Sequence, residues 1–180
     1  MGAREFWLHS LTMTLALVVF TCSLVAALTD PSTQPTTSQS KITAFQGEYR
    51  FLSNFYLATV EFEGITYPTV EHAYQSAKTL DLAERKRIAA LATPSDAKRE
   101  GRKLKLRDDW ETAKFDVMER CVRYKFTHDA SLREKLLATG DAILEEGNDW
   151  GDQVWGLVDG VGENRLGKIL MKVRAELREG

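Results

Sequence analysis

Apolar residues recur with the helical period along most of the chain from Val70 onward. The first helix is predicted over residues 70–80, where Val70, Ala73 and Tyr74 share one side and Thr69 is a suitable N-cap. The same period predicts five further helices, over residues 81–93, 94–106, 107–129, 130–140 and 164–179.

A different pattern precedes these helices. Residues 58–69, "ATVEFEGITYPT", place β-branched and aromatic residues on both sides of Gly64, which is typical of a short hairpin. Five glycines between residues 141 and 163 predict a loop before the last helix. The predicted fold is therefore mainly α: a single multihelical domain with a small β-hairpin near its N-terminus.

The first part of the chain follows neither pattern. No Asp, Glu, Lys or Arg occurs from Phe6 to Thr29, so residues 1–29 resemble a signal peptide or a membrane anchor. Residues 30–40 form a Ser/Thr/Pro linker, and the catalytic domain is predicted over residues 41–180. A stretch translated from an upstream start and a core helix are the other interpretations of the apolar segment, and the sequence leaves all three open.

Composition excludes several classes of protein. With 43% hydrophobic and 28% charged residues and a net charge of −2, the chain has no overall attraction to nucleic acid. Cys22 and Cys121 have no metal spacing, the three histidines are scattered, and phosphate-loop, dinucleotide and zinc-protease motifs do not occur. Residues 84–107 hold nine Lys/Arg against three Asp/Glu, which is typical of a solvated face but also suits a phosphorylated ligand.

Polar residues interrupt the first helix where packing alone would favour Leu or Ile. Glu71, Tyr74, Gln75 and Lys78 follow one another at helical spacing and should share one face, whereas position 72 points elsewhere. The face is either a solvent-exposed stripe or one wall of a site.

Two further motifs carry polar and aromatic residues. In "NDWGD", residues 148–152, a turn can present Trp150 and Asp152 to a ligand, or Trp150 can fill the core. In "GENRLGK", residues 162–168, helix-start N–H groups with Asn164 and Arg165 can form an anion site, or these residues can simply cap the helix. Paired carboxylates with tryptophans between them fit cleavage of an N-glycoside, which needs a base or nucleophile, an acid and a flat surface.

These motifs also resemble a known family. "FLSNFY", "YPTVEHAYQSAK", "DDWETAKFDVM", "RYKF", "LLATG", "WGD" and "GENRLGKILMKVR" occur in the order typical of the NADAR, or YbiA-like, family, over residues 43–178. The resemblance implies a mainly helical N-glycosidase without a metal or other cofactor. It implies as substrate either a small phosphorylated riboside, such as the ribosylamino-pyrimidine 5′-phosphates of early riboflavin synthesis, or an ADP-ribosylated guanine base in nucleic acid. A nucleotide-sugar binding module without turnover is the alternative outside enzymes.

The resemblance also assigns residues. It implies Glu71, Asp152, Trp110 and Trp150 as the catalytic set, while Trp155 matches no motif. The implied substrate-binding residues are Asn54, Phe55, Tyr74, Gln75, Lys78, Asn164 and Arg165. Lys78 is in addition a candidate amine nucleophile that forms a Schiff base with an opened ribose. Family chemistry predicts a cytoplasmic location, whereas the apolar segment predicts export or anchoring, with membrane contact through that segment only.

Overall fold

The computed structural model describes residues 39–180. The apolar segment 1–29 and the linker as far as residue 38 lie outside the described residues. None of the helices within residues 39–180 has the length and apolar character that a membrane span requires.

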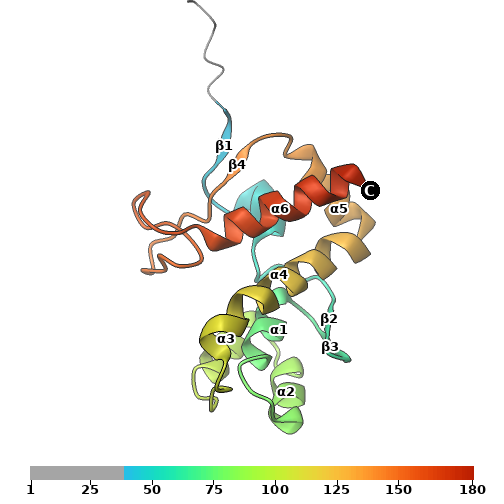
Figure 1. The fold of residues 1–180 in the computed structure, drawn as a ribbon, viewed down its shortest axis with the longest axis vertical. Helices are drawn as coiled ribbons and strands as arrows, with labels where there is room; N and C mark the ends of the chain where they lie inside the picture. Colours follow the sequence, from blue (N-terminus) through green and yellow to red (C-terminus); the bar gives the residue numbers. More distant parts are fainter. Residues whose placement is uncertain (1–38) are drawn as a thin grey trace, which may run out of the picture. The chain divides into compact units, whose positions relative to one another are not determined.

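The described chain is mainly helical, as predicted. Figure 1 shows α4 at the centre, with α1, α2, α3 and the β2–β3 hairpin on one side and α5 and α6 on the other. The helices are α1 (Val70–Ser76), α2 (Leu82–Ala89), α3 (Pro94–Gly101), α4 (Trp110–His128), α5 (Ala130–Ala138), α6 (Arg165–Glu179) and the 3-10 helix η1 (Gly47–Leu52).

The predicted hairpin is present around Gly64. Strands β2 (Val60–Phe62) and β3 (Ile65–Tyr67) pair antiparallel, with Val60 opposite Tyr67. Glu63 and Gly64 form the two-residue turn, and both have positive φ angles, 49° and 74°, as the favoured hairpin turn requires.

A second strand pair was not predicted. Strands β1 (Lys41–Ile42) and β4 (Ile143–Leu144) pair in parallel, with Lys41 opposite Ile143. Each strand has two residues, too few to show an alternating pattern. The pair ties the beginning of the described chain to the segment that leads into the loop before α6.

Three predicted helices are shorter than expected, and one of them, α2, ends at Ala89 instead of Thr93. α1 stops at Ser76 because the N–H groups of Lys78 and Thr79 donate to carbonyls three residues back, which tightens and ends the last turn. Leu80, inside the predicted helix 70–80, is 66% exposed, since the chain turns there toward α2. α3 begins at Pro94 as predicted and ends at Gly101 instead of near residue 106.

The core lies around α4. Its buried face carries Val117, Met118, Cys121, Val122 and Phe126, which contact the hairpin, α1 and α6. Cys121 is fully buried, and burial raises the pKa of its thiol, so this residue packs the core.

Candidate active site

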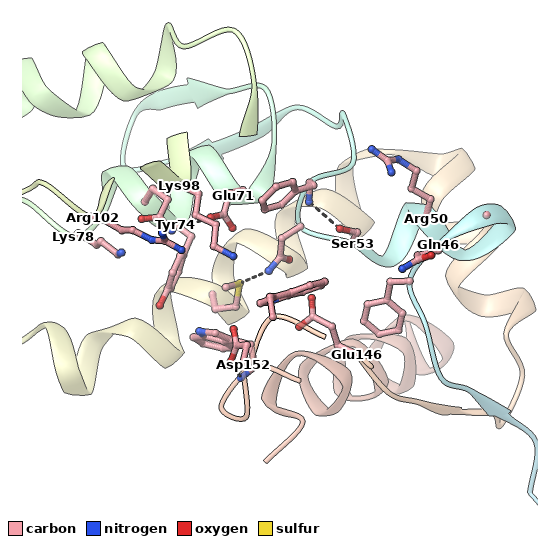
Figure 2. A pocket seen from close by; sticks show the side chains of 18 residues that line it. Gln46, Arg50, Ser53, Glu71, Tyr74, Lys78, Lys98, Arg102, Glu146 and Asp152 are labelled. Carbon is pink, nitrogen blue, oxygen red and sulfur yellow. Dashed lines mark hydrogen bonds between the residues drawn. The ribbon is translucent and has the colours of Figure 1, made fainter. Parts of the chain in front are cut away.

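The described residues enclose a cavity of about 660 Å³ beside α1 and α3 (Figure 2). Three segments line it. The helical wall comes from α1, its following turn and α3, and holds Glu71, Tyr74, Gln75, Lys78, Lys98 and Arg102. The loop wall, within residues 145–164, holds Glu146, Trp150, Asp152 and Trp155. The remaining rim includes Phe45, Gln46, Gly47, Arg50, Ser53, Asn54, Phe55 and Met118.

Glu71 is fixed at the start of α1. Thr69 caps the helix by accepting the N–H of His72, and the N–H of Glu71 donates to the carbonyl of Asn54 at 3.0 Å. Gln75, one turn later, donates from Nε2 to Glu71 Oε1 at 2.8 Å. Burial raises the pKa of the Glu71 carboxyl, and this hydrogen bond reverses only part of the shift.

Gln75 in turn depends on α3. A Cβ atom added to Gly101 would overlap the Gln75 side chain, so only glycine leaves room for it at this point of α3. Gln75 Oε1 is buried and has no partner within residues 39–180. The contact between α1 and α3 therefore sets the position of Gln75 and, through it, that of Glu71.

His72 points away from the cavity, as predicted. Its Nε2 donates to the carbonyl of Leu91 at 3.2 Å, and its Nδ1 lies 2.8 Å from the hydroxyl of Thr69. Within residues 39–180 no three His, Cys, Asp or Glu side chains are grouped as a metal site requires. His72 therefore holds α1 against the end of α2.

Four cations face the cavity without a carboxylate partner among the described residues: Arg50, Lys78, Lys98 and Arg102. By contrast, other basic side chains of the 84–107 run form ion pairs with acids, namely Arg85, Arg87, Arg99, Lys103 and Arg107. Lys78 lies just beyond α1 and not within it, and burial lowers the pKa of its amine. Some basic side chains of this run therefore form ion pairs with acids, and others face the cavity.

Asp152 organises the loop wall. Its Oδ1 accepts the N–H groups of Val154 at 3.0 Å and Trp155 at 2.9 Å. Asn148 bonds the backbone of Asp152 twice, accepting its N–H at 3.0 Å and donating to its carbonyl at 2.8 Å. These bonds hold one carboxylate oxygen in place and leave Oδ2 as the oxygen without a backbone donor.

Trp150 lies where it was expected, whereas Trp110 and Trp155 do not. Trp150 lines the cavity and is 57% exposed, with Lys98 Nζ 5.6 Å from its ring centre, so it does not fill the core. Trp110 does not line the cavity: it is 5% exposed and lies behind Tyr74, with ring centres 5.2 Å apart. Trp155, which matches no motif, does line the cavity and contacts the other side of the Tyr74 ring, at 5.5 Å.

Not all of the expected substrate-binding residues line the cavity. Its lining includes Asn54, Phe55, Tyr74 and Gln75, but not Asn164 or Arg165. Asn164 has a left-handed backbone, and its side chain accepts the N–H of Glu146 at 3.1 Å and donates to the carbonyl of Leu144 at 2.9 Å. Arg165 pairs with Glu163 and covers the ring of Phe115.

The N-terminus of α6 is also not free to bind an anion. The N–H groups of residues 163–166 donate to the carbonyls of Gln153, Gly156, Val154 and Trp155. The motif "GENRLGK" therefore anchors the loop wall onto α6, because its amides are already satisfied within the protein.

Sequence reasoning missed Glu146, which lies in the cavity beside the other acids. Its carboxyl is partly buried, and burial together with the charges of Asp152 and Glu71 raises its pKa to about 8. No motif marks this residue. Lys98 and Arg102 were missed individually, although the basic run had indicated phosphate.

The chain is similar to a known family and to several known proteins. A family model described as the NADAR domain matches residues 42–178. A protein of Escherichia coli named N-glycosidase YbiA is 41% identical over 133 residues, a match that covers 72% of this chain and 82% of that protein. An N-glycosidase of Nostoc punctiforme is 40% identical over 136 residues, covering 72% of this chain and 86% of the relative.

Two more similarities extend this result. A riboflavin biosynthesis protein of Vibrio vulnificus is 39% identical over 132 residues, which is 72% of this chain but 36% of that longer protein. The NMR structure of YbiA from Escherichia coli superposes with a TM-score of 0.70 at 39% identity, covering 78% of this chain and 87% of that one. The shared fold confirms the mainly helical class predicted from the sequence.

Proposed function

This chain belongs to the NADAR domain family, and on that premise we propose that it hydrolyses the C1–N bond of a phosphorylated N-riboside. It is a hydrolase that acts on N-glycosyl compounds, the class named by its relatives. The proposed substrates are ribosylamino-pyrimidine 5′-phosphates, and the relative named for riboflavin biosynthesis supports this choice.

One observation carries the proposal: acids and unpaired cations share a single cavity. Glu71, Glu146 and Asp152 offer carboxyl groups for proton transfer, and Lys98 and Arg102 can bind the 5′-phosphate without first breaking an ion pair. The cavity is large enough for one nucleotide-sized ligand.

The roles of the two motif acids follow from their surroundings. Burial favours the protonated form of Glu71, which can donate its proton to the departing nitrogen as the C1–N bond breaks. Asp152 Oδ2 can accept a proton from the water that attacks C1. The water oxygen then forms the new bond to C1, and the two carboxyl groups exchange their protonation states.

Three other side chains complete the proposed site. Tyr74 keeps its proton because burial raises the pKa of its phenol, so its hydroxyl is available to the ribose. Asn54 Oδ1 is buried and has no partner within residues 39–180, so it can accept a bond from a ribose hydroxyl. Trp150 can stack on the base.

Lys78 offers a second route to the same product. Burial favours its neutral amine, which can attack C1 of the ring-opened riboside, expel the base as its amine and form a Schiff base that water then hydrolyses. Borohydride added during turnover would then leave a reduced sugar adduct on Lys78, whereas direct attack by water would leave the protein unmodified.

The runner-up substrate is ADP-ribose attached to guanine in nucleic acid. Figure 2 places Arg50 on the opposite side of the cavity from Lys78 and Arg102, an arrangement that would suit a ligand with negative charge at both ends.

The test is to incubate the full chain separately with a ribosylamino-pyrimidine 5′-phosphate and with an oligonucleotide carrying ADP-ribosylated guanine. We expect release of ribose 5-phosphate from the first, and loss of this release in the Glu71→Gln variant. Faster turnover of the oligonucleotide would make the runner-up the function. Binding without either product would instead identify a nucleotide-sugar binding module.

We also propose that the catalytic domain needs none of the apolar segment 1–29. The cavity is lined by residues from Phe45 to Trp155, and the described chain is joined to the domain from its beginning: Gln39 Nε2 donates to the carbonyl of Asp141, and the carbonyl of Ser40 accepts the N–H of Ile143. A chain beginning at Gln39 should therefore be as active as the full chain. A folded but inactive product would make the earlier residues part of the site.

A further inference from the structure

Two neighbouring glutamates at the end of β4 face different surroundings. Glu145 is paired with Lys41, with 3.0 Å between carboxylate oxygen and amine nitrogen. Glu146 lines the cavity instead, and within residues 39–180 its carboxyl has neither an ion-pair partner nor a hydrogen-bond donor (Figure 2). A partly buried carboxyl without a partner is costly to keep, which indicates a purpose within the cavity.

The backbone holds Glu146 in this place from three sides. Its N–H donates to the side chain of Asn164, and its carbonyl accepts the N–H of Leu157 at 2.8 Å. A Cβ atom on Gly156 would overlap that same carbonyl, so a glycine is needed beside it. Asn164, which is buried, and Gly156 therefore fix the position of Glu146.

The charges around Glu146 favour its neutral form. Asp152 on the loop wall and Glu71 on α1 both raise its pKa, whereas Lys98 on α3 lowers it, and burial acts most strongly of all. The other charged groups lining the same cavity are Arg50 on η1, Lys78 just after α1 and Arg102 just after α3. With a pKa of about 8, Glu146 is an uncharged carboxylic acid at neutral pH.

A neutral carboxylic acid has a distinct hydrogen-bonding pattern. It offers one O–H donor and one C=O acceptor side by side in a plane. The complementary group is a lactam edge, an N–H next to a C=O, as found on pyrimidinone and purinone bases. A carboxylate would offer acceptors only, so the lactam oxygen would repel it.

We propose that Glu146 is a specificity-determining residue that selects substrates whose leaving base has a lactam edge. Its O–H donates to the lactam carbonyl, and its carbonyl oxygen accepts the lactam N–H. The exposed ring of Trp150, also on the loop wall, covers the face of the base while Glu146 binds its edge. This role rests on the proposed cleavage of an N-riboside, because Glu146 binds the group that departs.

The test uses binding of free bases, so it does not depend on turnover. The probes are a diamino-pyrimidinone and its O-methyl ether, which lacks the lactam N–H and C=O. Calorimetry with the full chain, in the presence of ribose 5-phosphate, measures both affinities at pH 6.5 and at pH 9. We expect wild type at pH 6.5 to bind the lactam about tenfold more tightly than the ether, the size expected when a paired polar edge is lost.

Three variants sharpen the result. Glu146→Gln keeps a neutral donor and acceptor, so its preference should persist and should not change with pH. Glu146→Ala should bind the two bases with equal affinity. Wild type should lose its preference for the lactam at pH 9, where the O–H donor of Glu146 is gone. Glu145, the neighbour that pairs with Lys41, provides the control, and Glu145→Gln should behave as wild type.

Several outcomes would overturn the proposal. They are a lactam preference that survives in Glu146→Ala, equal binding of both bases by wild type, and no binding of either base. A Glu146→Gln variant that loses the preference would also overturn the proposal, because its neutral amide keeps both the donor and the acceptor. If wild type prefers the lactam but hydrolyses no riboside, the selection stands and the proposed function fails.

Discussion

The two walls of the cavity are held by different forces. All seven residues of α1 are buried, so the helical wall is fixed by its capping residue Thr69 and by packing against α3 and α4. The loop wall has little regular structure between residues 145 and 164. Side chains of Asn148, Asp152 and Asn164 bond its backbone at several points and replace a helix or a sheet.

This difference decides how each wall tolerates change. Packed helices respond to lost volume and can adjust through side-chain motion. A loop held by single hydrogen bonds has few alternatives once a buried backbone group loses its partner. The loop wall should therefore be the more sensitive of the two, and the following expectations test this from the largest effect to the smallest.

The largest effect should come from removing one acid on each wall. We expect Glu71→Gln and Asp152→Asn each to lower kcat by about 10²–10⁴, because each would end a proton transfer. Glu71→Gln should keep the stability of wild type, since its amide oxygen can still accept from Gln75. Asp152→Asn can also still accept from Val154 and Trp155. Steady-state kinetics and urea unfolding check both, and wild-type turnover would remove that residue from the mechanism.

The tryptophans should separate packing from binding. Trp110→Ala removes a buried ring behind Tyr74 and should cost about 3–5 kcal/mol of unfolding free energy. Trp150→Ala removes an exposed ring and should leave the melting temperature nearly unchanged while raising KM. Melting curves and kinetics on both variants decide this, and an unaltered KM for Trp150→Ala would argue against stacking.

Two glycines offer a matched comparison of the walls. A Cβ at Gly101 would meet Gln75 Oε1, which can rotate away, and Gln75 Cβ at 2.8 Å, which can move only with α1, whereas a Cβ at Gly156 would meet the backbone carbonyl of Glu146. Overpacking costs about 1–3 kcal/mol, and we expect a smaller loss from Gly101→Ala than from Gly156→Ala. Truncating Gln75 to Ala should relieve part of the Gly101→Ala loss, and equal losses at the two glycines would contradict the contrast between the walls.

The smallest effect should be a dependence of stability on pH. The pKa of Glu146 rises from 4.5 to about 8 on folding, so between these values the folded protein keeps a proton that the unfolded chain releases. Stability should therefore fall as pH rises through this window, by at most about 1 kcal/mol per pH unit, because solvent screens the partly exposed carboxyl. Urea unfolding at pH 5 and pH 8 should show a smaller decrease for Glu146→Gln than for wild type, and Glu145→Gln serves as the control.

The sequence predicted the helical wall better than the loop wall, for a physical reason. Thr69, the helical period after it and the Glu63–Gly64 turn are local signals, and each is found where predicted. The helix containing Glu71 was nevertheless predicted too long, because nothing in its period shows that the chain turns after Ser76.

Placement of the loop residues depends on contacts between distant segments. Glu146 enters the cavity because Asn164, far along the chain, accepts its N–H. That bond also explains why Asn164, expected in the site, supports it from outside. For a similar reason Trp155 lines the cavity and Trp110 does not, the reverse of the expectation. Both rings pack against Tyr74, and this contact depends on the folded arrangement. No periodicity in the sequence encodes such arrangements.

The pairing of β1 with β4 has a consequence for the order of synthesis. β1 leaves the ribosome before its partner, Ile143–Leu144, which follows only after η1 and five α-helices, and the loop wall is anchored by α6 later still. A nascent chain can thus bury the helical wall while β1 remains unpaired and the cavity lacks Glu146 and Asp152. Activity can begin only once α6 has emerged, so a nascent chain that stops before this helix carries no working hydrolase.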